Sequence, residues 1–137
     1  MSALLVVHAA VTWTLVGMIW TVQLVHYPLW AQMSGDAFRE YHARHMWRIT
    51  MLVAPLAAVE FLTAAGLVWC GARGFWLLVS FVPMLVSGFS TFFVQVPLHA
   101  RLAVGFDAET LRKLVLSNWW RTAAWTVRGG CLVLALV

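Results

Sequence analysis

Long apolar runs, interrupted by short polar segments, set the pattern of this chain. Asp, Glu, Lys and Arg are absent before Asp36 and again between Arg73 and Arg101. A helix needs about 20 mostly apolar residues to cross a bilayer, and both uncharged stretches are longer than that. Together with the apolar segments that follow Arg48 and precede the C-terminus, the pattern predicts four membrane-spanning helices, at about residues 3–28, 48–70, 75–98 and 119–137.

Polar segments at residues 34–45 and 107–117 connect the predicted spans in pairs. Each begins with residues that cap helices, Ser34 and Asp36 in the first and Asp107 with Thr110 in the second. We therefore expect two short interfacial helices on the membrane surface. The turn at 71–74 is short enough to force an antiparallel pair of spans. The predicted fold is all-α, a four-transmembrane-helix bundle that forms one domain over residues 1–137.

The composition favours a membrane protein and excludes two other classes. Of the 137 residues, 63% are hydrophobic and 10% are charged, and the mean hydropathy is +0.85. A soluble domain carries roughly 25% charged residues, and a disordered chain lacks so many apolar ones. The first apolar run is too long for a cleaved signal peptide and has no basic residue before it. Cys70 and Cys131 are expected at different depths, as unpaired packing residues.

The basic residues indicate orientation in a membrane rather than nucleic-acid binding. The net charge is +4, but Lys and Arg lie beside the spans, where they fix topology. One face holds only Arg73, and the other holds Arg39, Arg44, Arg48, Arg101, Arg112, Lys113 and Arg121. We expect the lipid bilayer as partner, in a bacterial inner membrane with both termini extracytoplasmic. The expected interface anchors are Trp30, Trp47, Trp119 and Trp120 inside and Trp69 and Trp76 outside.

The two halves of the chain resemble each other. Residues 1–70 read QLVHYP from Gln23, then a polar connection, then WRIT from Trp47. Residues 75–137 read QVPLH from Gln95, then a polar connection, then WRT from Trp120. Duplication of a two-span unit gives this pattern, and so does convergence at helix ends. Either way, the shared residues fall at the cytoplasmic end of the predicted bundle.

Polar side chains inside the predicted spans fall on one face of each helix, at 100° per residue. Such groups are costly in lipid, usually face the bundle interior and mark functional sites. The residues are Gln23 and His26 in the first span, Glu60 in line with His42 in the second, Gln95 and His99 in the third, and Asn118, Arg121, Trp125 and Arg128 in the fourth. We therefore expect one shared polar interior.

Glu60 and Arg128 are the two charges expected to lie deepest. Glu60 is about 18 Å beyond Arg48 along its helix. A charge at the membrane centre costs roughly 2.5–3.5 kcal/mol on an insertion scale, so we expect these two residues to pair. The pair is either purely structural or a contact for a substrate or a proton.

Four of the five histidines, His26, His42, His45 and His99, gather at the predicted cytoplasmic end. Imidazole binds zinc, copper and iron, including haem iron, so these four are candidate metal ligands. They can instead hydrogen-bond to one another, to backbone and to lipid headgroups. A di-iron carboxylate site needs several carboxylates, and only Glu60 is available. The cofactor is thus haem, a histidine-bound metal ion or none. His8 is expected near the outer end, in a structural role.

These residues combine into one predicted site for a hydrophobic small molecule. A His or Glu serves as general base and an Arg stabilises negative charge; the candidate catalytic residues are His26, His99, Glu60 and Arg121. The candidate substrate-binding residues are Gln23, Gln95, Asn118, Trp125, Arg128 and Arg48. Arg48 and Arg121 otherwise anchor topology, and the deep tryptophans, Trp13, Trp20 and Trp125, either line an aromatic pocket or pack.

The later part of the chain carries a recognisable pattern. PLHARL from Pro97, a polar connection and NWWR from Asn118 resemble the second half of the DUF1772, or anthrone-oxygenase-like, small membrane proteins. Their pattern has Pro-x-Asn-x-x-Leu and Asn-x-x-Arg, so His99 replaces an Asn. The resemblance covers the last third best; HYP at His26 and YH at Tyr41 match a histidine-richer bacterial set. It implies a four-helix fold and oxygenation of an aromatic, polyketide-like substrate.

Three functions remain open from the sequence. The first is a membrane oxidoreductase that acts on a hydrophobic, aromatic molecule. The second is a haem- or metal-binding redox protein or carrier, and a fainter similarity to four-span haem proteins of the protoporphyrinogen-oxidase type implies haem. The third is a non-catalytic membrane subunit or transporter whose polar face is structural or conducts protons. A homo-oligomer is compatible with each.

Overall fold

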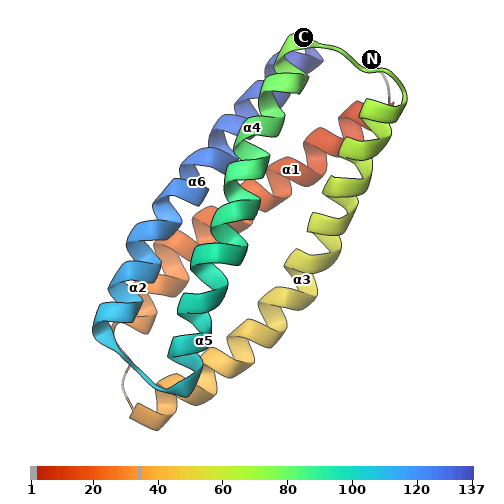
Figure 1. Ribbon diagram of the computed structural model, residues 1–137. Helices are drawn as coiled ribbons and strands as arrows, with labels where there is room; N and C mark the ends of the chain where they lie inside the picture. Colours follow the sequence, from red (N-terminus) through yellow and green to blue (C-terminus); the bar gives the residue numbers. More distant parts are fainter. Residues whose placement is uncertain (1–2, 34) are drawn as a thin grey trace.

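The computed structural model in Figure 1 describes residues 3–33 and 35–137, and these contain helices and no strands. The helices join into four rods. The first comprises α1 (Ala3–Thr21), η1 (Val22–His26) and α2 (Tyr27–Trp30), and the second is α3 (Gly35–Trp69). The third comprises α4 (Phe75–Ser90), η2 (Thr91–Gln95) and α5 (Val96–Val104), and the fourth is α6 (Ala108–Leu136). The all-α prediction is confirmed for the described residues.

Three of the four rods are long and apolar enough to cross a membrane. The candidate spans are Ala3–Trp30, Ala37–Trp69 and Phe75–Val104, with 28, 33 and 30 residues. This indicates an integral membrane protein. The 29 residues of α6 are also long enough, about 44 Å at 1.5 Å per residue, but Arg121 and Arg128 lower its hydropathy.

The two ends of the bundle differ in their connections (Figure 1). Both termini and the turn between α3 and α4 lie at one end, called the terminal end here. The connections that precede α3 and α6 lie at the other, called the basic end. α4 packs along α6, and α1 packs against both α6 and α3. The bundle therefore brings residues from all four rods together at each level.

The predicted surface helices are not separate elements, and this prediction is wrong. α3 runs without a break from Gly35 to Trp69 and so includes residues 35–45 of the first predicted segment, and α6 runs from Ala108 through Ser117. No Gly or Pro separates the polar segment from the apolar one in either helix, so the backbone hydrogen bonds simply continue. The cap at Asp107 is confirmed, since its carboxylate accepts a 2.9 Å hydrogen bond from the Thr110 N–H. The cap predicted from the side chains of Ser34 and Asp36 lies outside the described residues.

The first and third rods each contain one π-helical turn just before a proline: η1 precedes Pro28, and η2 precedes Pro97. Each turn begins six residues before its proline and ends two residues before it. The N–H of Tyr27 donates to the Val22 carbonyl, five residues back, and the N–H before Pro97 does the same. A proline offers no N–H and crowds the preceding turn, and a π-turn accommodates the extra space it needs. The two halves thus share this distortion as well as their similar sequences.

Candidate functional site

Arg128 is fully buried in the terminal half and makes polar contacts with three other rods. Its Nε donates to Glu60 Oε1 at 2.9 Å, which confirms the pair predicted from depth. Its Nη1 donates to the Ser80 carbonyl oxygen at 2.9 Å, and its Nη2 donates to His8 Nε2 at 3.0 Å. Arg128 and His8 are 0% exposed and Glu60 is 3% exposed, so the charges meet away from solvent.

The contacts of Arg128 fix the tautomer of His8. A guanidinium only donates hydrogen bonds, so His8 Nε2 must accept and His8 Nδ1 must carry the proton. That Nδ1 donates to the Thr63 hydroxyl at 2.7 Å. The Thr63 hydroxyl in turn donates to a backbone carbonyl one turn earlier. Thr12 completes the set, because its hydroxyl donates to Glu60 Oε1 at 2.7 Å.

We call this set the Arg128 network; its members are His8, Thr12, Glu60, Thr63, Ser80 and Arg128. None of its buried side-chain nitrogen and oxygen atoms lacks a partner. Trp125, predicted to bind substrate, lies beside it instead, with its ring centroid 5.9 Å from the Arg128 guanidinium carbon. A network whose bonds are all used internally stabilises the bundle but offers nothing to a ligand.

A second cluster occupies the basic half, where Trp30 is surrounded by imidazole rings. The Trp30 ring centroid lies 5.2 Å from that of His42, 4.8 Å from His45 and 5.9 Å from His99. His26 joins through His45, at 4.9 Å between centroids. Trp30 is 0% exposed, so its prediction as an interface anchor is wrong. Packing of Trp30 against Tyr27 and Phe38 in the local core explains why it turns inward.

This histidine cluster, formed by His26, Trp30, His42, His45 and His99, leaves part of its bonding capacity unused. Nε2 of His42 and Nδ1 of His99 are 3.2 Å apart, within hydrogen-bond distance. The buried atoms His26 Nδ1, Trp30 Nε1 and His42 Nδ1 have no partner. Buried polar atoms without partners are rare in folded proteins and ask for a functional explanation. The cluster therefore contains buried nitrogen atoms that are free to form further hydrogen bonds.

The predicted amide and arginine residues form a chain between α6 and the first rod. Asn118 Nδ2 donates to Gln23 Oε1 at 2.7 Å, and Arg121 Nη1 donates to Asn118 Oδ1 at 2.8 Å. Arg121 is close enough for its charge to act on His99 and on Tyr27. Gln95 Nε2 donates separately to Ser117 Oγ at 2.9 Å. Arg121 thus lies beside the histidine cluster, as predicted.

The structure divides the single predicted site into two. Glu60 and His42 are 18 residues apart on α3, about 27 Å along its axis, so Glu60 belongs with Arg128 and not with the histidines. Arg48 is exposed. The predicted residues line neither of two surface hollows, of about 530 Å³ and 880 Å³, that lie over α4, η2, α5 and α6, the larger also reaching Phe61 on α3.

The sequence analysis gave His8 a structural role near the outer end but did not predict its contact with Arg128, and it placed Trp30 at the membrane interface, although a signal for each position was present. His8 lies four residues before Thr12 and therefore on the same helix face, which directs it toward Glu60. Trp30 shares the face of Gln23 and His26 at helical spacing, and this places it inside rather than at the interface.

The four histidines do not form a ready metal site. Among residues 3–33 and 35–137, no three His, Cys, Asp or Glu side chains are placed to hold one ion. His42 and His99 are within hydrogen-bond distance of each other, while His26 packs against His45. Metal and haem ligation stay predictions, to be tested by composition. No protein-family model, curated protein or solved structure matches this chain.

Proposed function

We propose that the protein crosses a bacterial inner membrane four times, with both termini outside. Support comes from α6, whose deep charge is neutralised by Glu60 and which packs along α1 and α4. Reporter fusions test this: one after Val137 is expected to be active outside the cytoplasm, and one within the 105–107 connection only inside it. If both fusions report the same compartment, α6 does not span and the proposal fails.

The function that the geometry supports best is that of a small membrane oxidoreductase, oxygenase-like, for a hydrophobic aromatic molecule. The observation that carries it is the histidine cluster, where imidazoles from three rods meet and two ring nitrogens, His26 Nδ1 and His42 Nδ1, are buried without partners. Proton transfer is the chemistry that such imidazoles perform without a cofactor. The similarity of PLHARL and NWWR to anthrone-oxygenase-like proteins supports the same class.

The neighbouring residues have distinct roles in this proposal. His99 or His26 removes a proton from the substrate, and the nearby Arg121 stabilises the negative charge that develops. Gln23 and Asn118 hold Arg121 through their hydrogen bonds, and Gln95 lies close by. His26, His45 and His99 are half-buried, so a bilayer-dissolved molecule reaches the cluster from its lipid-facing side. Glu60 takes no part, because it lies in the other half of the bundle.

A second candidate is a haem- or metal-binding redox protein. The same unpartnered ring nitrogens favour it, since an unprotonated imidazole nitrogen is a ligand for iron, copper or zinc. Binding would require the histidines to rearrange around Trp30, because no three ligands converge as they stand among the described residues.

An absorption spectrum and elemental analysis of one purified sample separate the two candidates. A Soret band or stoichiometric metal favours the second; a colourless, metal-free protein that consumes oxygen with anthrone as the probe favours the first. His26→Ala and His99→Ala are then expected to lower oxygen uptake by about 10²-fold or more while remaining monodisperse. Trp47→Phe, on the exposed side of α3, is the control and should keep full activity. If both histidine variants stay folded and fully active, the site lies elsewhere.

A further inference from the structure

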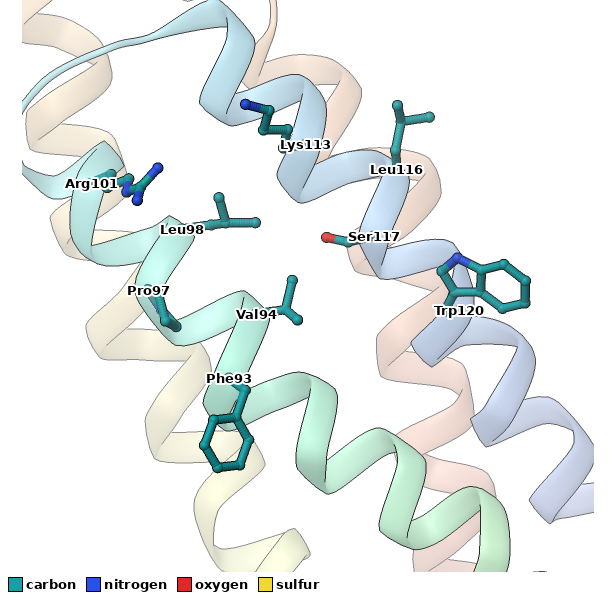
Figure 2. Close-up of a pocket in the computed structure, with 9 residues that line it drawn as sticks. All are labelled: Phe93, Val94, Pro97, Leu98, Arg101, Lys113, Leu116, Ser117 and Trp120. Atoms are coloured by element: carbon teal, nitrogen blue, oxygen red, sulfur yellow. The ribbon is translucent and has the colours of Figure 1, made fainter.

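A hollow of about 530 Å³ lies between the third rod and α6, on the outer surface of the bundle (Figure 2). The rod packs closely along α6 through α4 but less extensively beyond η2 and Pro97, where the hollow opens. The side chains of Val94, Leu98 and Ser117 point into it from the two walls. No residue of the Arg128 network or the histidine cluster lines it, so it is a separate feature.

The charged and the apolar side chains that line the hollow lie in different parts of it. Arg101 on α5 and Lys113 on α6 lie toward one end, on opposite walls, and both are exposed (Figure 2). The remaining lining is apolar except for one hydroxyl, and comprises Phe93, Val94, Pro97, Leu98, Leu116, Ser117 and Trp120. The hollow therefore has a cationic end and an apolar body.

The cationic end is not neutralised by the protein. Lys113 Nζ lies 3.4 Å from Glu109, but the same carboxylate also accepts from Arg112 at 3.0 Å. Arg101 has no ion pair among the described residues. The Asp107 carboxylate also acts on Lys113. Two carboxylates thus face three cations, Arg101, Arg112 and Lys113, which leaves a net positive charge at the mouth.

The apolar body continues beyond this hollow. A neighbouring depression of about 880 Å³ shares Phe93, Val94, Ser117 and Trp120 with it and extends over α4, with almost entirely apolar walls. The shared Ser117 hydroxyl is held from inside by Gln95, whose side chain is 2% exposed. One groove thus runs from a cationic mouth at the basic end, past a fixed hydroxyl, to an apolar trough in the spanning region.

We propose that this groove binds an anionic phospholipid, with its phosphate between Arg101 and Lys113 and an acyl chain along the trough. Arginine offers a planar fork that matches phosphate, and lysine adds a second point charge. Basic pockets between spanning helices are the sites where anionic headgroups bind. A zwitterionic lipid carries no net charge to balance the mouth and is disfavoured. This inference does not rest on the proposed enzymatic function.

The test compares the purified full chain with dioleoyl phosphatidylglycerol and with dioleoyl phosphatidylcholine, which have the same acyl chains. Native mass spectrometry measures bound lipid, and thermal unfolding in detergent measures stabilisation. We expect phosphatidylglycerol to be retained preferentially. The preference should fall about fivefold on losing one cation and about thirtyfold in Arg101→Gln/Lys113→Gln, given the usual contribution of a Lys or Arg near an anionic headgroup.

The matched control is Arg39→Gln/Arg44→Gln, which removes two exposed charges from α3 at the same end and should keep the preference. If it loses as much as Arg101→Gln/Lys113→Gln, binding is general surface attraction and the groove assignment is overturned. Lys113→Arg conserves charge and should keep the preference even where the double variant fails to fold; its loss there would overturn the proposal. Equal stabilisation by inorganic phosphate would also overturn it, by showing an ion site rather than a lipid site.

Discussion

The Arg128 network and the histidine cluster are built from similar side chains but treat them differently. In the network a full charge, Arg128, is buried, and every buried polar atom of the network has a partner. In the cluster the groups are four imidazole rings and one indole ring, and three of their buried nitrogens have no partner. Both lie inside the same bundle, about four helical turns or more apart along their helices.

The difference follows from the cost of burial. An unpaired charge in the low-dielectric interior costs several kcal/mol, so a buried Arg128 persists only with Glu60 and further acceptors around it. A neutral imidazole nitrogen without a partner costs less, on the order of 1–3 kcal/mol. A bundle can therefore tolerate a few unpartnered ring nitrogens, which stay available for chemistry, while every buried charge must be paired. The terminal half thus contains the closed, stabilising network, and the basic half contains the unpartnered nitrogens on which the proposed function rests.

Breaking the Arg128 network should have the largest effect on stability. Glu60→Gln or Arg128→Gln leaves a buried, uncompensated partner, and each is expected to lower the free energy of unfolding by about 3–5 kcal/mol. The double variant should lose less than the sum, because neither charge is then orphaned. Denaturant unfolding in detergent measures all three.

The control for these variants is Glu40→Gln, which removes a carboxylate from a pair with Arg44 whose side chains are 67% and 70% exposed. Such surface pairs contribute about 0–1 kcal/mol, so little change is expected. Strictly additive losses in the double variant would contradict the role of the Glu60–Arg128 contact in the comparison.

The spacing of α1 and α6 gives the next largest effect. A Cβ on Gly129 would lie 3.1 Å from the Trp13 ring, whereas one on Gly130 would meet nothing within 4 Å. Both substitutions to Ala gain the same helix propensity, so their difference isolates this contact. Gly129→Ala should be less stable than Gly130→Ala by about 1–3 kcal/mol, the usual cost of overpacking. Equal stability would show that the first rod can move without disturbing His8 and its bond to Arg128.

The architecture was largely predictable because the membrane makes charge placement informative. The two uncharged stretches and the apolar segment after Arg48 predicted the three spanning rods, and counting residues along α3 placed Glu60 opposite Arg128. The prediction of separate surface helices failed, because nothing in the polar segments indicates whether a helix bends onto the membrane surface or continues straight. The junctions HMWR, from His45, and SNWW, from Ser117, permit both. The π-turns follow from Pro28 and Pro97, but their position depends on how the rod packs.

The candidate site was only partly predictable. Helical phase gave the correct inward faces, so the histidines gather as expected. Helical phase predicts which face of a helix a side chain lies on, but not how its position along the bundle compares with that of residues on other helices. For this reason one predicted site became two, and Glu60 and Trp125 lie far from the histidine cluster. The lipid-facing groove had no signal, because Arg101 and Lys113 look like ordinary topology anchors until α5 and α6 are placed side by side.

A change within the histidine cluster should affect stability less than either change above. His99→Gln removes one imidazole but keeps a polar group that can still face His42, so we expect a loss of only about 1 kcal/mol. The same variant should lose oxygen uptake or bound cofactor, because an amide does not titrate. Unfolding and activity measured on one preparation give both values. A stability loss as large as that of Glu60→Gln would make the cluster a second structural network and end the contrast.

The smallest effect concerns the start of α6, whose stability depends on pH in the acid range. The Thr110 hydroxyl and N–H donate to the Asp107 carboxylate and hold the pKa of Asp107 below its ordinary value. A lowered folded-state pKa adds stability that is fully present above the ordinary pKa and is lost as pH falls through the lowered one. Asp107→Asn should therefore remove part of the decline in unfolding midpoint below about pH 4, and Thr110→Val, which removes only the hydroxyl, a smaller part.

The distance along α6 from Asp107 decides which half of the bundle is affected when this cap is lost. Fraying from Asp107 reaches Asn118 and Arg121 beside the histidine cluster well before Arg128, which lies 21 residues along the helix. At pH 7, amide hydrogen exchange in Asp107→Ala should consequently rise over the first turns of α6 and remain unchanged around Arg128. Uniform acceleration along α6 would mean that the helix unfolds as one unit, and that the two halves of the bundle are less independent than their hydrogen bonding indicates.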